Sequence, residues 1–288
     1  MKYQFKAYAK INLSLDVLSK RLDGYHNVHM LMQTVELCDR VYIRPDYADI
    51  TVRVTCENRA DVPQGEKNLA HIAATLFLEA ANIHAGVNIV IDKQIPLCAG
   101  LAGGSADAAA VFFGLNEIFG RPLSTAKLLE LGAKVGADVP FCILKGTAVA
   151  TGIGEILTPI SPFPKTPVLI VVPDFTVSTP WVYENLKLDA ILHHPDISGM
   201  AALIKANQFS DFYEKMGNVL ECVTVARYPE IETIRQQLLS LGARGARMSG
   251  SGPSVFGLFD HLETCEAAYK ICKQTYNTAF LTFTHNPV

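Results

Sequence analysis

The most constraining feature of this 288-residue sequence is a glycine-containing stretch, residues 96–110, which reads Pro-Leu-Cys-Ala-Gly-Leu-Ala-Gly-Gly-Ser-Ala-Asp-Ala-Ala-Ala. It follows a β-branched run at residues 87–91, which predicts a strand, and leads into an apolar run at residues 108–113, which predicts a buried helix. A glycine turn between a strand and a helix presents backbone N–H groups at the positive end of the helix dipole. The stretch therefore predicts an anion site, with Ser105 placed to cap the helix or to bind a phosphate oxygen and Asp107 in its first turn.

Two common phosphate-binding motifs are absent from this stretch. No lysine follows Gly104, which excludes a P-loop. The dinucleotide fingerprint Gly-x-Gly-x-x-Gly fits neither here nor at residues 152–154 or 250–252, which disfavours a nucleotide-binding oxidoreductase. Taken alone, the stretch is also compatible with an ordinary tight turn before a helix.

Composition narrows the class of protein. The length suits two domains, and the net charge of −3, without clusters of basic and aromatic residues, disfavours nucleic-acid binding. The start lacks a secretion signal, and no apolar run approaches the roughly 20 residues that span a bilayer, so we expect no membrane association. Seven scattered cysteines without a Cys-x-x-Cys pair disfavour disulfides and zinc, and a reducing cytoplasm fits best.

Periodicity places the rest of the chain. Residues 10–17 alternate as a strand, with Lys10 and Asn12 on the face opposite the apolar one, where a solvated position is usual. A turn at residues 23–27 carries Tyr25 and His26. Further strands are predicted at residues 31–37, 39–43, 50–54, 147–150, 168–172, 279–284 and on both sides of a Gly-Ser turn after residue 245, and helices at 68–81, 124–134, 231–241 and 262–275, with Asn68 and Ser124 as N-caps. The order of elements in the second half suits a helix-backed antiparallel sheet. Four prolines in residues 158–167 predict a passage between two domains.

Three stretches together resemble the three motifs of the GHMP kinases, which phosphorylate small molecules such as galactose, homoserine, mevalonate and phosphomevalonate. They are Ala-Lys-Ile-Asn-Leu at residues 9–13, the glycine stretch at 96–109, and Met-Ser-Gly-Ser-Gly-Pro-Ser-Val-Phe at 248–256. Within this group, Arg-Leu-Asp-Gly-Tyr-His at residues 21–26 and Gly-Ala-Asp-Val-Pro-Phe at 136–141 resemble the 4-diphosphocytidyl-2-C-methyl-D-erythritol kinases. The resemblance covers essentially the whole chain, with the motifs in the same order and spacing.

The resemblance implies an α+β, two-domain GHMP kinase fold. An N-terminal α/β domain, residues 1–157, and a C-terminal ferredoxin-like domain, residues 158–288, would enclose the active site. It also implies ATP-dependent phosphorylation of the 2-hydroxyl of a cytidine diphosphate sugar-alcohol, with Mg²⁺, in the non-mevalonate isoprenoid pathway. We expect a cytoplasmic monomer or weak homodimer that binds neither nucleic acid nor membrane.

The resemblance also implies catalytic and binding residues, at the positions of this sequence that match the family's motifs. Asp138 matches the family's base, and Lys10 matches the lysine that keeps the aspartate ionised and lowers the pKa of the alcohol. The ATP site would comprise Pro96, Leu97, Cys98, Ala99, Gly100, Leu101, Ala102, Gly103, Gly104, Ser105, Ala106 and Asn68. The substrate site would comprise Asn12, Tyr25, His26, Thr179 and Tyr183, with the two tyrosines stacking on cytosine. No protein ligand of Mg²⁺ is assigned.

Two departures from the family pattern concern the glycine stretch. Ala102 stands where glycine is usual, so that position either needs no strongly positive φ or carries strain. Ala106 stands where serine is usual and removes a hydroxyl from the phosphate neighbourhood. The alternatives are a homoserine or mevalonate kinase, whose substrates have no base for Tyr25 and His26 to bind, and a non-catalytic nucleotide sensor. The presence of both Lys10 and Asp138 disfavours the sensor.

Overall fold

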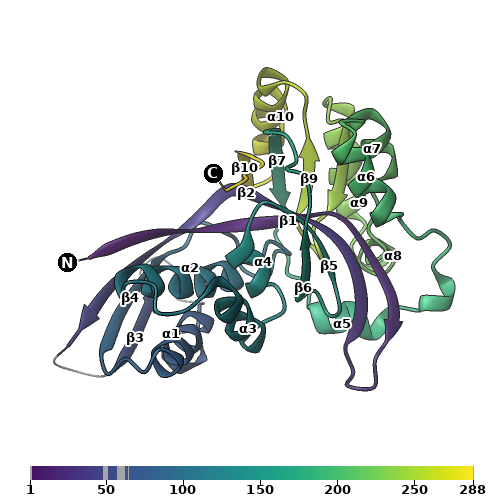
Figure 1. Ribbon diagram of the computed structural model, residues 1–288. Coiled ribbons are helices and arrows are strands. Elements are labelled where there is room, and N and C mark those ends of the chain that lie inside the picture. The colour runs from purple at the N-terminus through teal and green to yellow at the C-terminus, as the bar shows by residue number, and fades with distance from the viewer. Residues whose placement is uncertain (1, 48–50, 57–61, 64, 288) are drawn as a thin grey trace. The chain divides into compact units, whose positions relative to one another are not determined.

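The computed structural model describes residues 2–47, 51–56, 62–63 and 65–287, which divide into two compact units. Unit 1 comprises Met1–Ala9, Leu37–Leu97 and Ala102–Leu144, and unit 2 comprises Lys10–Glu36, Cys98–Leu101 and Lys145–Val288. The chain begins with two long paired strands, β1 (Tyr3–Lys20) and β2 (His26–Asp46), and each contributes residues to both units (Figure 1). The glycine stretch is also shared, because only its residues 98–101 lie in unit 2.

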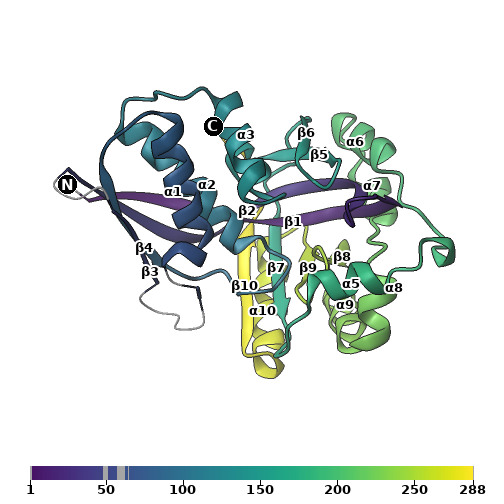
Figure 2. The same ribbon diagram turned by 90° about the horizontal axis from the view of Figure 1, so that it is seen from below.

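Unit 1 combines strands with a layer of helices. Strand β4 (Gly86–Asp92) pairs antiparallel with β2 and parallel with β3 (Val52–Cys56). The helical elements are η1 (Gly65–Lys67), α1 (Leu69–Ala80), α2 (Gly103–Ile118), α3 (Thr125–Val135) and α4 (Val139–Leu144), with α1 and α2 side by side (Figure 2). Ile43 of β2 pairs with the buried Ile89 of β4, and a Cβ at Gly114 of α2 would lie 2.7 Å from Ile43 Cδ1. Helix α2 therefore covers this face of the sheet at close range.

The C-terminal part of unit 2 is an antiparallel four-stranded sheet in the order β10-β7-β9-β8. Its strands are β7 (Pro167–Val172), β8 (Gly245–Met248), β9 (Val255–Leu258) and β10 (Thr278–Phe283). Helix α9 (Glu230–Ser240) packs against β8 and β9, and α10 (Leu262–Thr275) packs against β7 and β10 (Figure 1). This order is that of the ferredoxin-like fold, in which the strands from neighbouring βαβ units interleave. It confirms the predicted helix-backed antiparallel sheet.

The other elements of unit 2 are short. They are β5 (Thr147–Thr151), β6 (Ile156–Pro159), α5 (Thr179–Asn185), η2 (Leu188–Ala190), α6 (Ile197–Lys205), α7 (Phe209–Lys215) and α8 (Glu221–Arg227). Strand β5 pairs with both β2 and β6. The proline-rich residues 158–167 lead from β6 to β7, and Phe163 among them is fully buried. Among the described helices, none has both the length and the apolar character needed to cross a membrane.

Most predicted elements are present. The helices predicted at residues 68–81, 124–134, 231–241 and 262–275 are α1, α3, α9 and α10, and the side chains of Asn68 and Ser124 cap α1 and α3 as expected. The two strands predicted at residues 31–37 and 39–43 are wrong as separate elements, because β2 runs through both. Asp39, where the second strand was predicted to begin, lies inside β2 and is buried in an ion pair. The strand predicted at residues 50–54 is β3, which begins at Val52, and Ile50 lies outside the described residues.

Candidate active site

The turn between β4 and α2 contains three residues in the left-handed region of backbone conformation. They are Cys98 (φ 50°), Gly100 (φ 75°) and Ala102 (φ 58°). Left-handed backbone costs a residue with a Cβ about 1–2 kcal/mol, whereas glycine adopts it freely. Ala102, the N-cap of α2, therefore carries strain, which decides between the two alternatives that the sequence left open for this position.

We expect Ala102→Gly to raise the free energy of unfolding by up to about 1 kcal/mol, because it removes this strain. The gain is smaller than the full left-handed penalty, since glycine also loses more backbone entropy on folding. Urea unfolding of the two proteins measures the difference. Ala109→Gly in the interior of α2 is the matched control and should lower stability by about 1 kcal/mol. A less stable Ala102→Gly variant would contradict the strain.

Within unit 2, the centre of the glycine stretch packs on the Ser-Gly turn, which we define as residues 249–254. A Cβ at Gly100 would overlap the carbonyl oxygen of Ser249, so this position requires glycine for space as well as for its φ. The Ser249 hydroxyl donates to the Gly100 carbonyl at 2.9 Å, and the Ser254 N–H donates to the Ala99 carbonyl at 3.3 Å. The Ser-Gly turn therefore holds residues 98–101 in place.

Lys10 and Asn12 of β1 lie at the same place in unit 2. The Lys10 N–H donates to the Leu101 carbonyl at 3.2 Å, and the Asn12 N–H donates to the Ser249 hydroxyl at 3.3 Å. Their side chains are 4% and 0% exposed, so the usual solvated position is wrong here. Asn12 Oδ1 accepts a hydrogen bond from the Lys10 ammonium at 2.7 Å. Parts of all three motifs thus contact one another within unit 2.

Helix α5 connects two of the candidate substrate residues to this region. The hydroxyl of Thr179, at its first residue, lies 2.7 Å from the hydroxyl of Ser251 in the Ser-Gly turn. Tyr183 follows four residues later and so lies on the same face of the helix. Its ring centre is 5.1 Å from that of His26, with the planes tilted by 32°.

Tyr25 and His26 lie where the turn after β1 leads into β2. The Tyr25 side chain is 60% exposed, whereas His26 is buried. Burial, and to a lesser degree the charge of Lys20, lowers the pKa of His26. The neutral imidazole has one donor and one acceptor nitrogen, which suits the polar edge of a base.

Within unit 1, the first turn of α2 lies beside two other candidates. A Cβ at Gly104 would lie 3.5 Å from Leu69 Cδ1, so Gly104 is close to the start of α1. The residue before Leu69 is Asn68, whose side-chain oxygen accepts from the Ala70 N–H and caps α1. On another side, a Cβ at Gly136 would lie 3.8 Å from the Ser105 hydroxyl. Of the predicted site residues, those that belong to unit 1 are Pro96, Leu97, Ala102, Gly103, Gly104, Ser105, Ala106, Asn68 and Asp138.

Asp138 closes the turn that begins at Gly136. Its backbone carbonyl accepts from the Cys142 N–H at 3.1 Å, which starts α4, and the residue is half-buried. Gly136 places this turn next to Ser105, so the candidate base and the helix end of the glycine stretch are neighbours in unit 1.

The other predicted site residues belong to unit 2. They are Lys10, Asn12, Tyr25, His26, Cys98, Ala99, Gly100, Leu101, Thr179 and Tyr183.

Two predictions about the start of α2 are wrong. Ser105 does not cap the helix, because the helix already begins at Gly103 and its N-cap is Ala102. Asp107 consequently lies in the second turn, where it is buried and bonded to Lys93. Neither Lys93 nor its second partner, Asp39, was a candidate, because periodicity gives no sign that distant charged residues pair.

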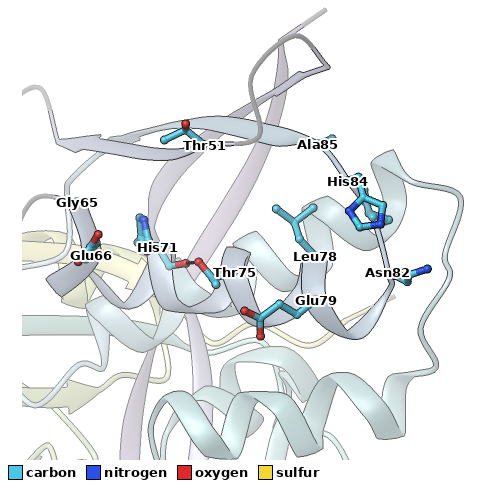
Figure 3. A pocket seen from close by; sticks show the side chains of 11 residues that line it. Thr51, Gly65, Glu66, His71, Thr75, Leu78, Glu79, Asn82, His84 and Ala85 are labelled. Atoms are coloured by element: carbon cyan, nitrogen blue, oxygen red, sulfur yellow. Dashed lines mark hydrogen bonds between the residues drawn. The ribbon is translucent and has the colours of Figure 1, made fainter.

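The surface of unit 1 has a hollow of about 640 Å³ between α1 and the residues that precede β3 and β4 (Figure 3). It is lined by Thr51, Gly65, Glu66, His71, Thr75, Leu78, Glu79, Asn82, Ile83, His84 and Ala85. None of the candidate residues lies among them, so the hollow is separate from the glycine stretch. Across the described part of the chain, no three His, Cys, Asp or Glu side chains are grouped to hold a metal ion.

Comparisons with known proteins agree on one family. The family model described as GHMP kinases N terminal domain matches residues 68–146, and the model described as GHMP kinases C terminal matches residues 190–278. A protein of Lachnoclostridium phytofermentans named 4-diphosphocytidyl-2-C-methyl-D-erythritol kinase is 49% identical over 282 residues, which is 96% of each chain. A protein of Geobacillus thermodenitrificans with the same name is 46% identical over 290 residues, 99% of each chain.

Solved structures agree with these relatives. A crystal structure of 4-(cytidine 5'-diphospho)-2C-methyl-D-erythritol kinase matches with a TM-score of 0.85 and 32% identity, covering 99% of this chain and 100% of that one. A homoserine kinase from Cytophaga hutchinsonii matches with a TM-score of 0.81 and 21% identity, covering 99% and 94%. At that identity, the second match shows a shared fold.

Proposed function

Because the chain belongs to the GHMP kinases, and within them to the 4-diphosphocytidyl-2-C-methyl-D-erythritol kinase family, we propose that it phosphorylates the 2-hydroxyl of that substrate. ATP is the phosphoryl donor, and the products are the 2-phosphate and ADP. The observation that carries the proposal is that parts of the three GHMP kinase motifs are hydrogen-bonded to one another in unit 2. The Lys10 N–H donates to the Leu101 carbonyl, and the Ser249 hydroxyl donates to the Gly100 carbonyl.

The glycine stretch is proposed to hold the phosphates of ATP. Phosphoryl transfer proceeds through a loose transition state, so it depends on positioning and on stabilisation of charge. The first N–H groups of α2 supply partial positive charge without side chains in the way, because Gly103 and Gly104 begin the helix. Asn68, at the start of α1 beside Gly104, is proposed to lie toward the adenosine.

Mg²⁺ fits this site as an ion carried on the phosphates. It prefers oxygen ligands and commonly binds through one or two protein groups together with substrate phosphates. Ser105 and the turn that ends at Asp138 supply such oxygens on neighbouring elements of unit 1, without a preformed cluster of three ligands among the described residues. Bound there, the ion would neutralise charge on the phosphates.

Asp138 and Lys10 are proposed to act on the acceptor alcohol. The alcohol is tertiary, because the carbon that carries it also carries a methyl group, so it is a weak nucleophile. A carboxylate within hydrogen-bond reach can accept its proton, and this role falls to Asp138. The Lys10 ammonium would keep the carboxylate ionised and lower the pKa of the alcohol. Asn12, which binds that ammonium, would orient it and contact the substrate.

The cytidine part is proposed to bind at the turn that carries Tyr25. An exposed aromatic ring can stack on a base, and the neutral His26 beside it can bind the base edge. Tyr183 and Thr179, on one face of α5, would complete the substrate site.

The domain boundary is part of the proposal. The two family models, at residues 68–146 and 190–278, fall on either side of a division into residues 1–157 and 158–288, which supports it. A monomer or weak homodimer in the cytoplasm is proposed with it. Among the described cysteines, Cys98, Cys222, Cys265 and Cys272 are free thiols, in keeping with a reducing compartment.

A panel of acceptors tests the proposed function. The protein is incubated with ATP, Mg²⁺ and either the cytidine substrate, homoserine or mevalonate, and ADP formation is followed. We expect turnover with the cytidine substrate alone. Turnover only with homoserine or mevalonate would overturn the assignment of substrate, and ATP binding without turnover would indicate a nucleotide sensor.

We expect Tyr25→Ala to raise the KM for the cytidine substrate and to lower kcat/KM about tenfold to a hundredfold, because base stacking contributes roughly 1–3 kcal/mol. The KM for ATP should stay nearly unchanged. Tyr25→Phe is the matched control and should be mild, since stacking needs the ring and not the hydroxyl. Parallel steady-state series in the two substrates provide the measurement, and normal use of the cytidine substrate by a stable Ala variant would remove Tyr25 from the base site.

A further inference from the structure

A buried cluster of three charged side chains lies in unit 1, directly behind the glycine stretch. The Lys93 ammonium lies 2.5 Å from Asp39 Oδ2 and 2.7 Å from Asp107 Oδ2, and all three side chains are almost fully buried. Asp39 Oδ1 also accepts from the N–H groups of Gln94 and Ile95, at 2.5 and 2.8 Å. The cluster therefore joins β2, the segment after β4, and helix α2.

These partners hold the two ends of one loop. Asp39 binds the N–H groups of the two residues that precede Pro96, where the glycine stretch begins. Asp107 follows Ala106, where the phosphate-binding part of the stretch ends. Lys93 bonds to both carboxylates, so a single ammonium ties the entry of the loop to its exit.

The loop needs such support because its backbone is strained. Cys98 and Ala102 both have positive φ without being glycine, and strained conformations persist only where the surroundings determine them. Lys93 also lies against the turn where the loop becomes α2, since a Cβ at Gly103 would be 3.2 Å from its Nζ.

The protonation of the cluster is consistent with a buried ion pair between Lys93 and Asp39. Burial raises the pKa of Asp107, Lys93 opposes this shift, and the charge of Asp39 adds to it. Asp107 Oδ1 has no hydrogen-bond partner, and the Lys93 ammonium binds the other oxygen, Oδ2. Burial lowers the pKa of Lys93, but its two carboxyl neighbours outweigh burial and raise it. Lys93 therefore stays charged, with Asp39 as its counter-ion.

We propose that Lys93 is a positioning residue for nucleotide binding, which, through Asp39 and Asp107, holds residues 96–106 in the shape that receives the phosphates. The inference rests on the proposed role of the glycine stretch in binding ATP. It assigns Lys93 no contact with the reacting atoms. Its effect passes through the geometry of the loop and of the first turn of α2.

Lys93→Met in the full-length chain tests this role. Isothermal calorimetry with a non-hydrolysable ATP analogue and Mg²⁺ should show a Kd raised about tenfold to a hundredfold, the range for loss of a charged hydrogen bond. The KM for ATP should rise in parallel, while the KM for the cytidine substrate stays within about twofold. If Lys93→Met does not fold, Asp39→Asn replaces it, because the amide oxygen still accepts from Gln94 and Ile95 while the counter-ion is lost.

Asn116→Ala is the matched control. Its amide both donates to and accepts from the Leu123 backbone, at 3.0 and 3.1 Å, near the other end of α2. This variant should lose thermal stability and keep the Kd for the analogue. If the charged variants also lose only stability, the positioning role is wrong. Calorimetry measures nucleotide binding without turnover. If the wild-type chain binds the analogue but does not phosphorylate the cytidine substrate, the proposed function is overturned, and the positioning role of Lys93 can still be tested.

Discussion

Asp138→Asn should lower kcat by about 10²–10⁴-fold, the usual contribution of a general base, and leave the KM for ATP close to that of the wild type. Asparagine keeps the shape of the side chain but cannot take the proton of the alcohol. The backbone bond from Cys142 that starts α4 uses the carbonyl of residue 138, so the substitution leaves it in place. Steady-state kinetics with the cytidine substrate measures the loss.

The control for this experiment is Glu130→Gln. Glu130 lies on α3 of the same unit, exposed and paired with Lys127, so the change removes one carboxylate of unit 1 away from the candidate site. It should leave kcat and both KM values unchanged. A folded Asp138→Asn variant with near wild-type kcat would exclude Asp138 as the base.

Lys10→Met should lower kcat about 10²–10³-fold, because a preorganised charge aimed at the reacting group is worth this much in similar sites. Methionine is unbranched and nearly as long as lysine, so it can fill the buried space that the Lys10 side chain occupies beside Asn12. The expected signature is a large fall in kcat with little change in thermal stability. Single-turnover measurements separate this chemical step from product release.

Lys6→Met provides the comparison on the same strand. Lys6 is exposed, so its substitution by methionine changes the net charge by the same amount but alters no buried position. Its kcat should match that of the wild type. Equal kcat values for the two variants would show that Lys10 has only a packing role.

Local patterns predicted the elements of this fold well, because each depends on neighbouring residues. The amphipathic run before Gly242 and the capping side chains of Asn68 and Ser124 are examples: each is present in the structure where periodicity and cap chemistry placed it. The ferredoxin-like order of the second sheet, in contrast, came from the family resemblance. Alternation alone does not say which strands pair.

The candidate site was predicted unevenly for the same reason. Alternation placed Lys10 and Asn12 on one strand face, but their burial depends on Ser249, which is 237 residues from Asn12. Ala102 was left with two alternatives, and only the backbone of the folded loop decides that it is strained. Asp107 shows the limit most clearly, because its partner Lys93 lies across a loop and no local pattern pairs them.

The division of β1, β2 and the glycine stretch between two units has a consequence for biosynthesis. Unit 2 takes residues from Lys10–Glu36 and from Lys145–Val288, and Leu15 on β1 bridges to Asn218. A ribosome therefore releases the first of these segments long before its partners exist. Pairings of such large sequence separation form slowly. Unit 1, whose last residue is Leu144, can be synthesised completely while unit 2 still lacks most of its chain. No single cut in the chain would yield both units as separate fragments.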